Sequence, residues 1–298
     1  MNEAINQLKY YIESKEVSQN KVANAIGVSA ATISGILKGT YEGNNESVIE
    51  KIKDFLATEA YREAAKSNDV TVKTKNFNTI HRFCNLVLTH RVMGMLTGEA
   101  GIGKTRALQA YAEAHPTCIM IEADHGYTAK VFFEELCELL NLDKRGSLHD
   151  KLERVVKKLD GSGRLIIIDE AEHLPYRAIE LIRRVYDKAH VGIALCGMPR
   201  LEKNVQGDKE HYAQIYSRIS APCRAKLLDN ADIKAYLESR FEKIAAGVVE
   251  LCAGISRRNF RLLSHLALWS RVVMQNNNIP ELSEEVVKTA SQMLVVAQ

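Results

Sequence analysis

The sequence predicts an α/β core with a parallel sheet, preceded by an all-helical domain and followed by a small helical lid. Three observations predict this fold: a glycine-rich turn follows a short apolar run, a second apolar run ends in two carboxylates, and strand-like runs alternate with helical stretches. Such alternation is typical of a parallel sheet with helices on its faces. With 298 residues, 46% of them hydrophobic, the chain can bury a sizeable core and is long enough for about two domains.

Changes in composition divide the chain into four segments. Residues 1–65 have a helical pattern, and the polar stretch KSNDVTVKTKN indicates a linker at 66–76. The α/β core spans 77–228, and the purely helical pattern beyond it indicates a lid at 229–298. The predicted strands of the core are 93–96, 118–121, 165–168, 193–196 and 223–228, and its predicted helices include 130–142 and 178–188.

The N-terminal segment contains the spacing of a helix-turn-helix in SQNKVANAIGVSAATISGILKG. Ser18 and Ser29 are the predicted N-caps, and Gly27 supplies the turn between the two helices. The exposed face of the second helix would place Thr32, Ser34 and Lys38 on DNA. That face has no Arg, Asn or Gln for bidentate base contacts, so strong sequence readout is not expected.

The charge of this segment also argues against strong DNA binding. Residues 1–65 contain seven Lys and Arg against nine Asp and Glu, a net charge of 7 − 9 = −2. A strong phosphate binder would be basic. A purely protein-facing helical module therefore stays open as the alternative.

The glycine-rich stretch LTGEAGIGKTRAL fits the pattern G-x-x-x-x-G-K-[ST]. Its backbone N–H groups would surround the phosphates of ATP at the start of a helix. Lys104 would reach the β and γ phosphates, and Thr105 would ligate Mg²⁺. A chance glycine-rich turn is the alternative. The predicted nucleotide contacts in this stretch are Gly98, Glu99, Ala100, Gly101, Ile102, Gly103, Lys104, Thr105 and Arg106.

The stretch RLIIIDEAEHL reads as a buried parallel strand that delivers acids to its carboxyl end. Asp169 would hold the Mg²⁺ shell through a water molecule, and Glu170 would polarise the water that attacks the γ phosphate. A surface acidic turn is the alternative. Together with the glycine-rich stretch, this order of motifs predicts ATP hydrolysis.

Cysteine usage and hydropathy limit the remaining classes. The six cysteines are scattered with no C-x-x-C pair, which predicts buried reduced thiols and no metal site for them. No apolar run approaches the roughly 18 residues of a membrane span, and the N-terminus lacks an apolar signal core. A cytoplasmic location without a membrane partner is expected.

A net charge of +3 is too small to identify a nucleic-acid partner by itself. Basic residues do crowd one loop and helix of the core, where Lys144, Arg145 and Lys151 are the predicted phosphate contacts. A solvated helix face is the alternative reading. The further basic residues of this cluster are Arg154, Lys157 and Lys158.

Together, the helix-turn-helix, TGEAGIGKT, LIIIDEAEHL and GIALCGMPR resemble the MuB family, the target-selecting AAA+ P-loop ATPases of phage Mu transposition and related prophages. The resemblance runs nearly end to end. It implies a homo-oligomer that assembles as an ATP-dependent helical filament on double-stranded DNA with little sequence preference. Such a protein recruits and stimulates a transposase and disassembles on hydrolysis, in the host cell of a phage or prophage.

The resemblance also implies roles for arginines outside the two motifs. Arg218 in YSRIS matches an arginine finger that reaches a neighbour's γ phosphate, with Arg224 as the second choice. An ordinary ion-pairing arginine is the alternative for both. In RRNFRLLSHLAL, Arg261 would touch the nucleotide, and Arg257 or Arg258 could do so instead.

The chain departs from the AAA+ pattern after the fourth strand. A polar side chain that orients the attacking water is usual there, but the matching position in ALCGMPR is Met198. A thioether cannot donate that hydrogen bond. Either hydrolysis is slow, or another side chain such as His173 takes the role.

Two other functions stay open at this point. A nucleotide-sensing transcription regulator would use the helix-turn-helix for operator binding and would give sequence-specific footprints. A helicase loader shares the same core and would bind a replicative helicase in place of a transposase. A transposase gene immediately upstream would favour the transposition function.

Overall fold

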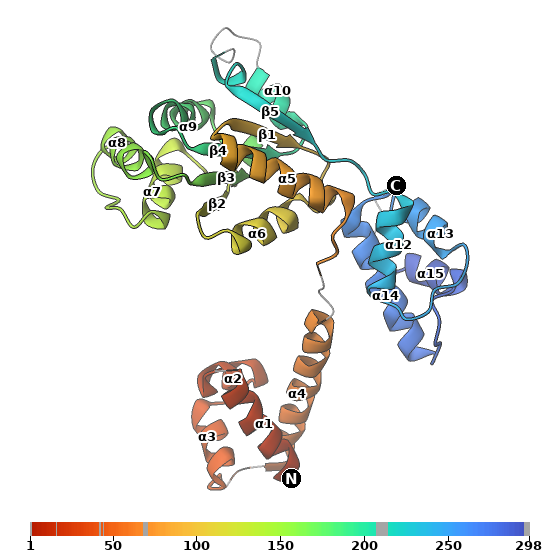
Figure 1. Ribbon diagram of the computed structural model, residues 1–298. Helices are drawn as coiled ribbons and strands as arrows, with labels where there is room; N and C mark the ends of the chain where they lie inside the picture. Colours follow the sequence, from red (N-terminus) through yellow and green to blue (C-terminus); the bar gives the residue numbers. More distant parts are fainter. Residues whose placement is uncertain are drawn as a thin grey trace. The chain divides into compact units, whose positions relative to one another are not determined.

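The computed structural model describes residues 2–15, 17–41, 43, 45–67, 71–206 and 214–294. The chain forms two compact units, Met1–Thr71 and Val72–Gln298. The first unit is helical throughout its described residues. Its helices are α1 (Asn2–Ser14), α2 (Gln19–Ile26), α3 (Ala30–Lys38) and α4 (Asn45–Ser67) (Figure 1).

Both predicted caps of the α2–α3 pair are present. The Ser18 side chain accepts the N–H of Lys21, and the Ser29 side chain accepts the N–H of Thr32 at 3.0 Å. Gly27 joins the helices with φ 73°, a left-handed conformation that a side chain disfavours. Apolar side chains from α1, α2, α3 and α4 form one core around this pair, with Leu8, Val22, Ile33 and Ile52 fully buried. The two helices form as predicted, while the DNA contact of Thr32, Ser34 and Lys38 stays a prediction.

The segment between α4 and α5 is shorter than the linker predicted at 66–76. Helix α4 continues to Ser67, and α5 (Lys75–His90) begins one residue before the predicted end of the linker. Thr74 starts α5 because its side chain accepts the N–H of Phe77 at 3.2 Å. A polar composition alone did not reveal these helix ends.

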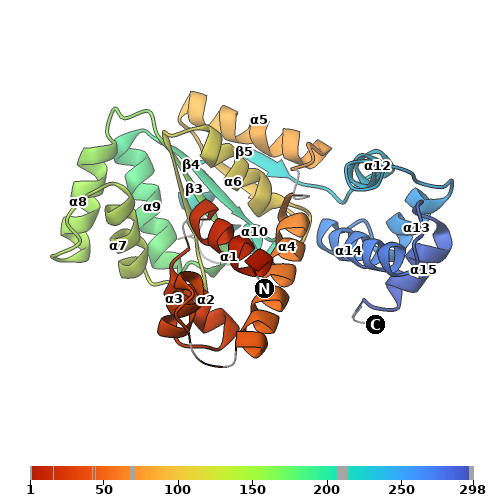
Figure 2. The ribbon, with the colours of Figure 1, turned by 90° about the horizontal axis from the view of Figure 1, so that it is seen from below.

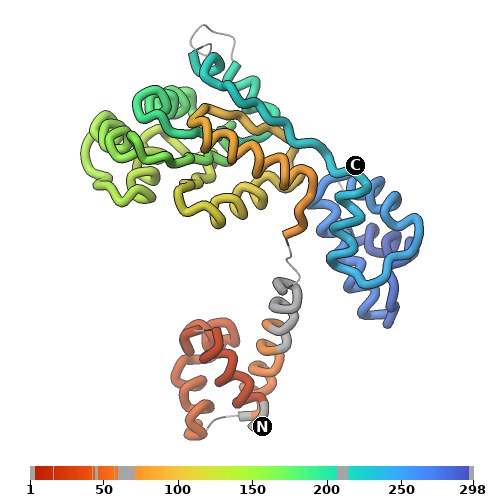
Figure 3. The backbone as a smooth tube through the Cα atoms, in the orientation of Figure 1, coloured from red at the N-terminus to blue at the C-terminus, as the bar shows by residue number. Residues whose placement is uncertain are grey.

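The second unit contains a five-stranded parallel sheet in the order β2-β3-β4-β1-β5. Four strands lie where the sequence predicts them, and β5 differs. The strand predicted at 223–228 starts and ends too late: pairing with β1 begins at Ile219 and ends at Arg224, and Leu228 is buried in the core of the lid. Figure 3 shows the chain leaving β5 for the lid helices. The strands are β1 (Met93–Thr97), β2 (Cys118–Glu122), β3 (Leu165–Asp169), β4 (Gly192–Gly197) and β5 (Ile219–Arg224).

Helices cover both faces of this sheet because its central strands are apolar on both sides. In β3, Leu165 and Ile167 pack with α5 and α6, whereas Ile166 and Ile168 pack with α7 and α9. Helix α8 packs outside these, against α7 and α9. The flanking helices after α5 are α6 (Lys104–Ala114), α7 (Ala129–Leu139), α8 (Leu148–Leu159) and α9 (Tyr176–Ala189) (Figure 2).

A helical lid with its own apolar core follows the sheet. Its helices gather at the end of the unit away from α7, α8 and α9 (Figures 1 and 2). None of the helices in the described part of the chain combines the length and the apolar character that a membrane crossing requires. The short helix α10 (Arg200–Gln206) follows β4, and the lid comprises α12 (Asn230–Glu238), α13 (Val248–Ile255), α14 (Phe260–Asn276) and α15 (Glu284–Ser291).

Candidate nucleotide-hydrolysis site

The glycine-rich loop connects the carboxyl end of β1 to the first residue of α6. Gly103 begins the helix from a left-handed conformation, with φ 92°. Lys104 follows it and is buried, with Nζ donating to the carbonyl oxygens of Gly98 at 2.7 Å and Glu99 at 2.9 Å. Burial lowers the pKa of Lys104, although the carboxylates of Asp169 and Glu172 oppose that effect. A buried ammonium at a helix N-terminus fits the phosphates of a nucleotide.

Thr105 and Asp169 supply oxygen atoms that fit a magnesium ion. Asp169 ends β3 and is 1% exposed. The Thr105 hydroxyl donates to Asp169 Oδ2 at 2.6 Å, so the start of α6 and the end of β3 meet at one point. Mg²⁺ prefers such oxygen ligands and completes its shell with water and phosphate. The donor set therefore fits the predicted Mg²⁺ position, where the ion would neutralise phosphate charge.

Glu170 stands immediately after β3 in a backbone conformation that is rare for a residue with a side chain. Its φ is 51°, and it precedes the short 3₁₀ helix η1 (Ala171–His173). The N–H of Glu170 donates to Asp169 Oδ1 at 3.0 Å. Its carboxylate is about half exposed and lies 3.5 Å from His173 Nε2. An acid placed here can take a proton from water at the mouth of the pocket.

The lid closes one side of the same pocket. Asn259 Nδ2 donates to the Ala100 carbonyl at 2.7 Å, and the N–H of Arg261 donates to the Gly101 carbonyl at 3.0 Å. Arg261 lines the pocket, as predicted for the nucleotide contact of the lid. Arg258 does not line it, because its guanidinium donates to the Leu228 carbonyl at 3.1 Å. Arg257 is also outside the lining.

The resulting pocket has a volume of about 270 Å³ and brings the two sequence motifs together. Among the predicted nucleotide contacts, Gly98, Glu99 and Ile102 do not line it: the first two offer their carbonyls to Lys104, and Ile102 is buried. The lining residues are Ala100, Gly101, Gly103, Lys104, Thr105, Arg106, Asp169, Glu170, Glu172, His173, Gly197, Met198, Phe260 and Arg261.

Sequence reasoning missed three of these lining residues: Glu172, Gly197 and Phe260. A signal existed for Glu172, because the stretch DEAEHL carries another acid two residues after Glu170. Gly197 and Phe260 had no comparable signal, since each becomes part of the pocket only when β4 and the lid pack beside the loop.

The position of Met198 agrees with the departure noted in the sequence. Its side chain lines the pocket at the end of β4, so no polar side chain stands there. Its backbone N–H donates to Glu172 Oε1 at 3.1 Å. His173, the substitute considered above, lines the same pocket, but its ring contacts Glu170, Arg200 and His125.

The two candidate finger arginines lie at opposite edges of the sheet. Arg218 precedes β5, whose Ile219 pairs with Met93 at the amino edge, whereas Arg224 pairs with Thr97 at the carboxyl edge. Neither lines the pocket of its own subunit. Arg224 Nη2 donates to Glu202 at 2.6 Å.

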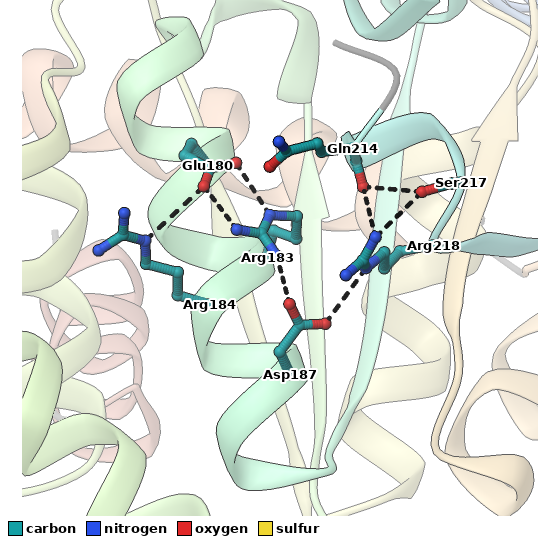
Figure 4. Close-up of polar contacts among 7 residues, drawn as sticks. All are labelled: Glu180, Arg183, Arg184, Asp187, Gln214, Ser217 and Arg218. Carbon is teal, nitrogen blue, oxygen red and sulfur yellow. Dashed lines mark hydrogen bonds and ion pairs between the residues drawn. The ribbon is translucent and has the colours of Figure 1, made fainter. Parts of the chain in front are cut away.

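Figure 4 shows Arg218 in a polar cluster between α9 and the turn before β5. Its Nε lies 3.5 Å from Asp187 Oδ1, and its Nη1 donates to Ser217 Oγ at 3.1 Å and to the Gln214 carbonyl. Asp187 also pairs with Arg183, which in turn pairs with Glu180 at 2.6 Å. Arg218 is thus ion-paired within its own chain, and its action on a neighbour stays a prediction.

The basic cluster of the core does not present all three predicted phosphate contacts. Lys151 is 1% exposed, with Nζ donating to the Gly146 carbonyl at 2.8 Å and lying 3.4 Å from Glu134. Its prediction as a DNA contact is therefore wrong, because the ammonium is enclosed by its own fold. Arg145 is 93% exposed, and Lys144 is half exposed beside Glu138, so these two stay predictions.

Comparison with known proteins agrees with this geometry. A model of the AAA domain matches residues 87–205. The chain is 26% identical over 245 residues to the Mu-like prophage FluMu DNA transposition protein B of Haemophilus influenzae, covering 79% of this chain and 84% of that protein. It is 27% identical over 241 residues to the ATP-dependent target DNA activator B of Escherichia phage Mu, covering 78% and 76%.

Two solved structures illustrate the shared fold. The Aeropyrum pernix ORC2 protein superposes with a TM-score of 0.56 at 16% identity, covering 77% of this chain and 70% of that one. Domain III of the Thermotoga maritima replication initiation protein DnaA gives a TM-score of 0.51 at 15% identity, covering 76% and 95%. At these identities the likeness concerns the fold alone. The chain therefore has the AAA+ P-loop ATPase fold and is similar in sequence to the transposition B proteins of phage Mu and of a Mu-like prophage.

Proposed function

We propose that this protein is a transposition-related ATPase that assembles on double-stranded DNA when it binds ATP and recruits a transposase to that DNA. One observation carries the proposal: Lys104, Thr105, Asp169 and Glu170 converge on one pocket in a homologue of proteins named ATP-dependent target DNA activators. In this proposal hydrolysis releases the assembly. Little sequence preference is expected, because the exposed face of α3 lacks the usual base-reading side chains.

The position of Arg218 supports assembly by like copies. Nucleotide binds at the carboxyl edge of the sheet, and Arg218 stands at the amino edge. About five residues of strand, or roughly 17 Å, separate the two edges. Arg218 therefore suits the pocket of an adjoining subunit better than its own. A head-to-tail arrangement of this kind builds rings or helical filaments.

Electron microscopy with arbitrary duplex DNA tests the assembly. The protein with ATP and Mg²⁺ should form oligomers on the DNA, and Lys104→Ala should form none because the phosphates lose their buried cation. Lys288→Ala, at an exposed lysine of α15 outside both the pocket and the basic cluster, serves as the matched control. Wild-type protein that stays monomeric on DNA with ATP, or Lys104→Ala that assembles normally, contradicts the proposal.

Glu170→Gln tests the link between hydrolysis and release. The amide leaves ATP binding intact but cannot accept a proton from water, so assemblies should persist with ATP. Their lifetime is measured by the loss of protein from labelled DNA after dilution. Release as fast as in the wild type would separate disassembly from hydrolysis and refute that step.

Transposase recruitment is tested on the assembled protein. Labelled DNA carrying the ATP-bound assembly should retain a purified phage-type transposase, and bare DNA or DNA with Lys104→Ala protein should retain much less. Equal retention in all three cases would contradict the role as a recruiting platform.

A further inference from the structure

A buried carboxylate in the pocket has an oxygen atom without a partner. The Glu172 side chain is 2% exposed and lines the pocket beside Glu170. Its Oε1 accepts the N–H of Met198 at 3.1 Å and lies 3.8 Å from Arg200 Nε. Within the described part of the chain, Oε2 is buried and accepts no hydrogen bond. Buried polar atoms are nearly always satisfied, so this oxygen indicates a donor that arrives with a ligand.

The surroundings fix the direction of this carboxylate in advance. Oε2 lies against Gly197, where a Cβ would overlap it, so a larger residue at the end of β4 would have to displace the carboxylate. Asn204 Nδ2 donates to the Glu172 carbonyl at 3.1 Å and holds the backbone of η1 against α10. Turning the carboxylate away from the pocket would break its hydrogen bond to the Met198 N–H and its contact with Arg200.

A water molecule has the O–H donor that Oε2 lacks. A phosphate oxygen cannot, because it would bring a second negative charge without a proton. The water that attacks the γ phosphate has two O–H groups, and Glu170 can accept only one of them. The Met198 thioether at the end of β4 is a poor acceptor for the other.

We propose that Glu172 is a second carboxylate of the hydrolytic site, in which Oε1 is anchored on the Met198 N–H and Oε2 accepts the other O–H of the attacking water. Glu170 takes the proton of the first O–H, and the water oxygen forms its bond to phosphorus as the bond to the leaving ADP oxygen breaks. Glu172 exchanges no proton and fixes the direction of the attacking lone pair. The inference rests on the proposed ATP hydrolysis and names a residue that carries it.

Glu172→Gln separates this role from a structural one. Glutamine preserves the volume, and its carbonyl oxygen can still accept the Met198 N–H, but this leaves an NH₂ donor facing the water. We expect kcat to fall about 10- to 100-fold, with KM for ATP and the Kd of a non-hydrolysable ATP analogue within about twofold of wild type. Glu153→Gln, an exposed glutamate on α8, is the matched control and should leave all three values unchanged.

Two readouts are independent of turnover. Glu172→Gln should bind ADP with aluminium fluoride, which mimics the state that includes the aligned water, at least about tenfold more weakly than wild type. The affinity for ADP with beryllium fluoride should not change. The Tm of the full chain should change little, because the substitution removes the cost of burying a charge but also weakens its attraction to Lys104 and Arg200.

Other outcomes overturn the assignment. A wild-type kcat in Glu172→Gln together with a lower kcat in Glu172→Ala would show that the side chain only accepts the Met198 N–H. Equal weakening of both fluoride complexes, or a lower Tm with a matching loss of nucleotide affinity, would show a structural role. If the wild-type chain on duplex DNA hydrolyses no ATP but still assembles, then hydrolysis itself fails and the assignment fails with it. If hydrolysis persists without assembly, only the proposed function on DNA fails.

Discussion

At the scale of single residues, burial decides which of several like side chains acts in function. Lys144, Arg145 and Lys151 are neighbours in sequence and look equivalent there. In the structure, Lys151 holds the loop before α8 by its bond to the Gly146 carbonyl, while Arg145 projects from that loop. The same contrast separates Lys104, a buried cation in the pocket, from the exposed lysines of α8.

Lys151→Met should destabilise the protein and leave DNA binding intact. The substitution removes the donor to a part-buried carbonyl and the cation beside Glu134, at a cost of about 1 to 2 kcal/mol. Urea denaturation measures that loss, and a DNA titration measures affinity. Arg145→Ala is the opposite case, with unchanged stability and weaker DNA binding. A Lys151→Met protein that folds normally but binds DNA more weakly would show that Lys151 does contact DNA phosphates.

The cysteines should react slowly while the protein is folded. Burial raises the pKa of Cys118 to about 11 and that of Cys196 well above its usual range, so little thiolate forms near pH 8. A disulfide reagent that detects thiolate should report a slow phase in the native protein and all six thiols after unfolding. Immediate titration of six thiols in the native state would contradict the burial described here.

At the scale of elements, turn conformation and strand pairing set the boundaries. Gly27 lets α2 and α3 meet at a tight turn, and the end of β3 places Asp169 and Glu170 at the edge where α6 begins. The fifth strand shows where strand prediction from the sequence fails, because residues 223–228 are divided between the sheet and the core of the lid.

Two glycine substitutions should have opposite effects on stability. A Cβ at Gly27 meets no atom within 4 Å. Gly27→Ala should therefore lower the free energy of unfolding only through its left-handed φ of 73°, by about 1 to 2 kcal/mol. Gly254 also has free space around it but lies in α13, so Gly254→Ala should stabilise by about 0.4 to 1 kcal/mol. Hydrogen exchange of the surrounding helices measures each effect in its own unit. Equal changes at both sites would show that backbone conformation is not the cause.

At the scale of the whole molecule, the nucleotide site and Arg218 lie at opposite edges of one sheet. A single chain therefore does not bring its own Arg218 to its own nucleotide. ATP turnover per subunit should rise with protein concentration and with DNA, since both promote contact between copies. In the isolated chain, Arg218 is paired with Asp187 and must exchange that partner for a neighbour's phosphate.

Mixing two inactive proteins tests the shared site. Arg218→Ala keeps a complete pocket, and Glu170→Gln keeps Arg218, so about a quarter of the interfaces in an equal mixture would combine an intact pocket with an intact arginine. The mixture should therefore hydrolyse ATP although neither protein does so alone. A mixture of Arg224→Ala with Glu170→Gln is the control. Arg224→Ala keeps both Glu170 and Arg218, so this mixture should hydrolyse ATP only in proportion to the Arg224→Ala protein it contains. No recovery in the first mixture would refute the shared site.

The sequence by itself predicted the nucleotide chemistry and determined most of the fold. The two motifs identify Lys104, Thr105, Asp169 and Glu170 because phosphate and magnesium binding require those residue types at fixed spacing, and hydrophobic period places four of the five strands. Only the tertiary structure showed that Lys151 is enclosed, that Glu172 lies in the pocket under Gly197, and that Arg218 and Arg224 stand at opposite edges. The physical reason is that burial and strand register arise from contacts between distant segments, which local sequence patterns do not contain.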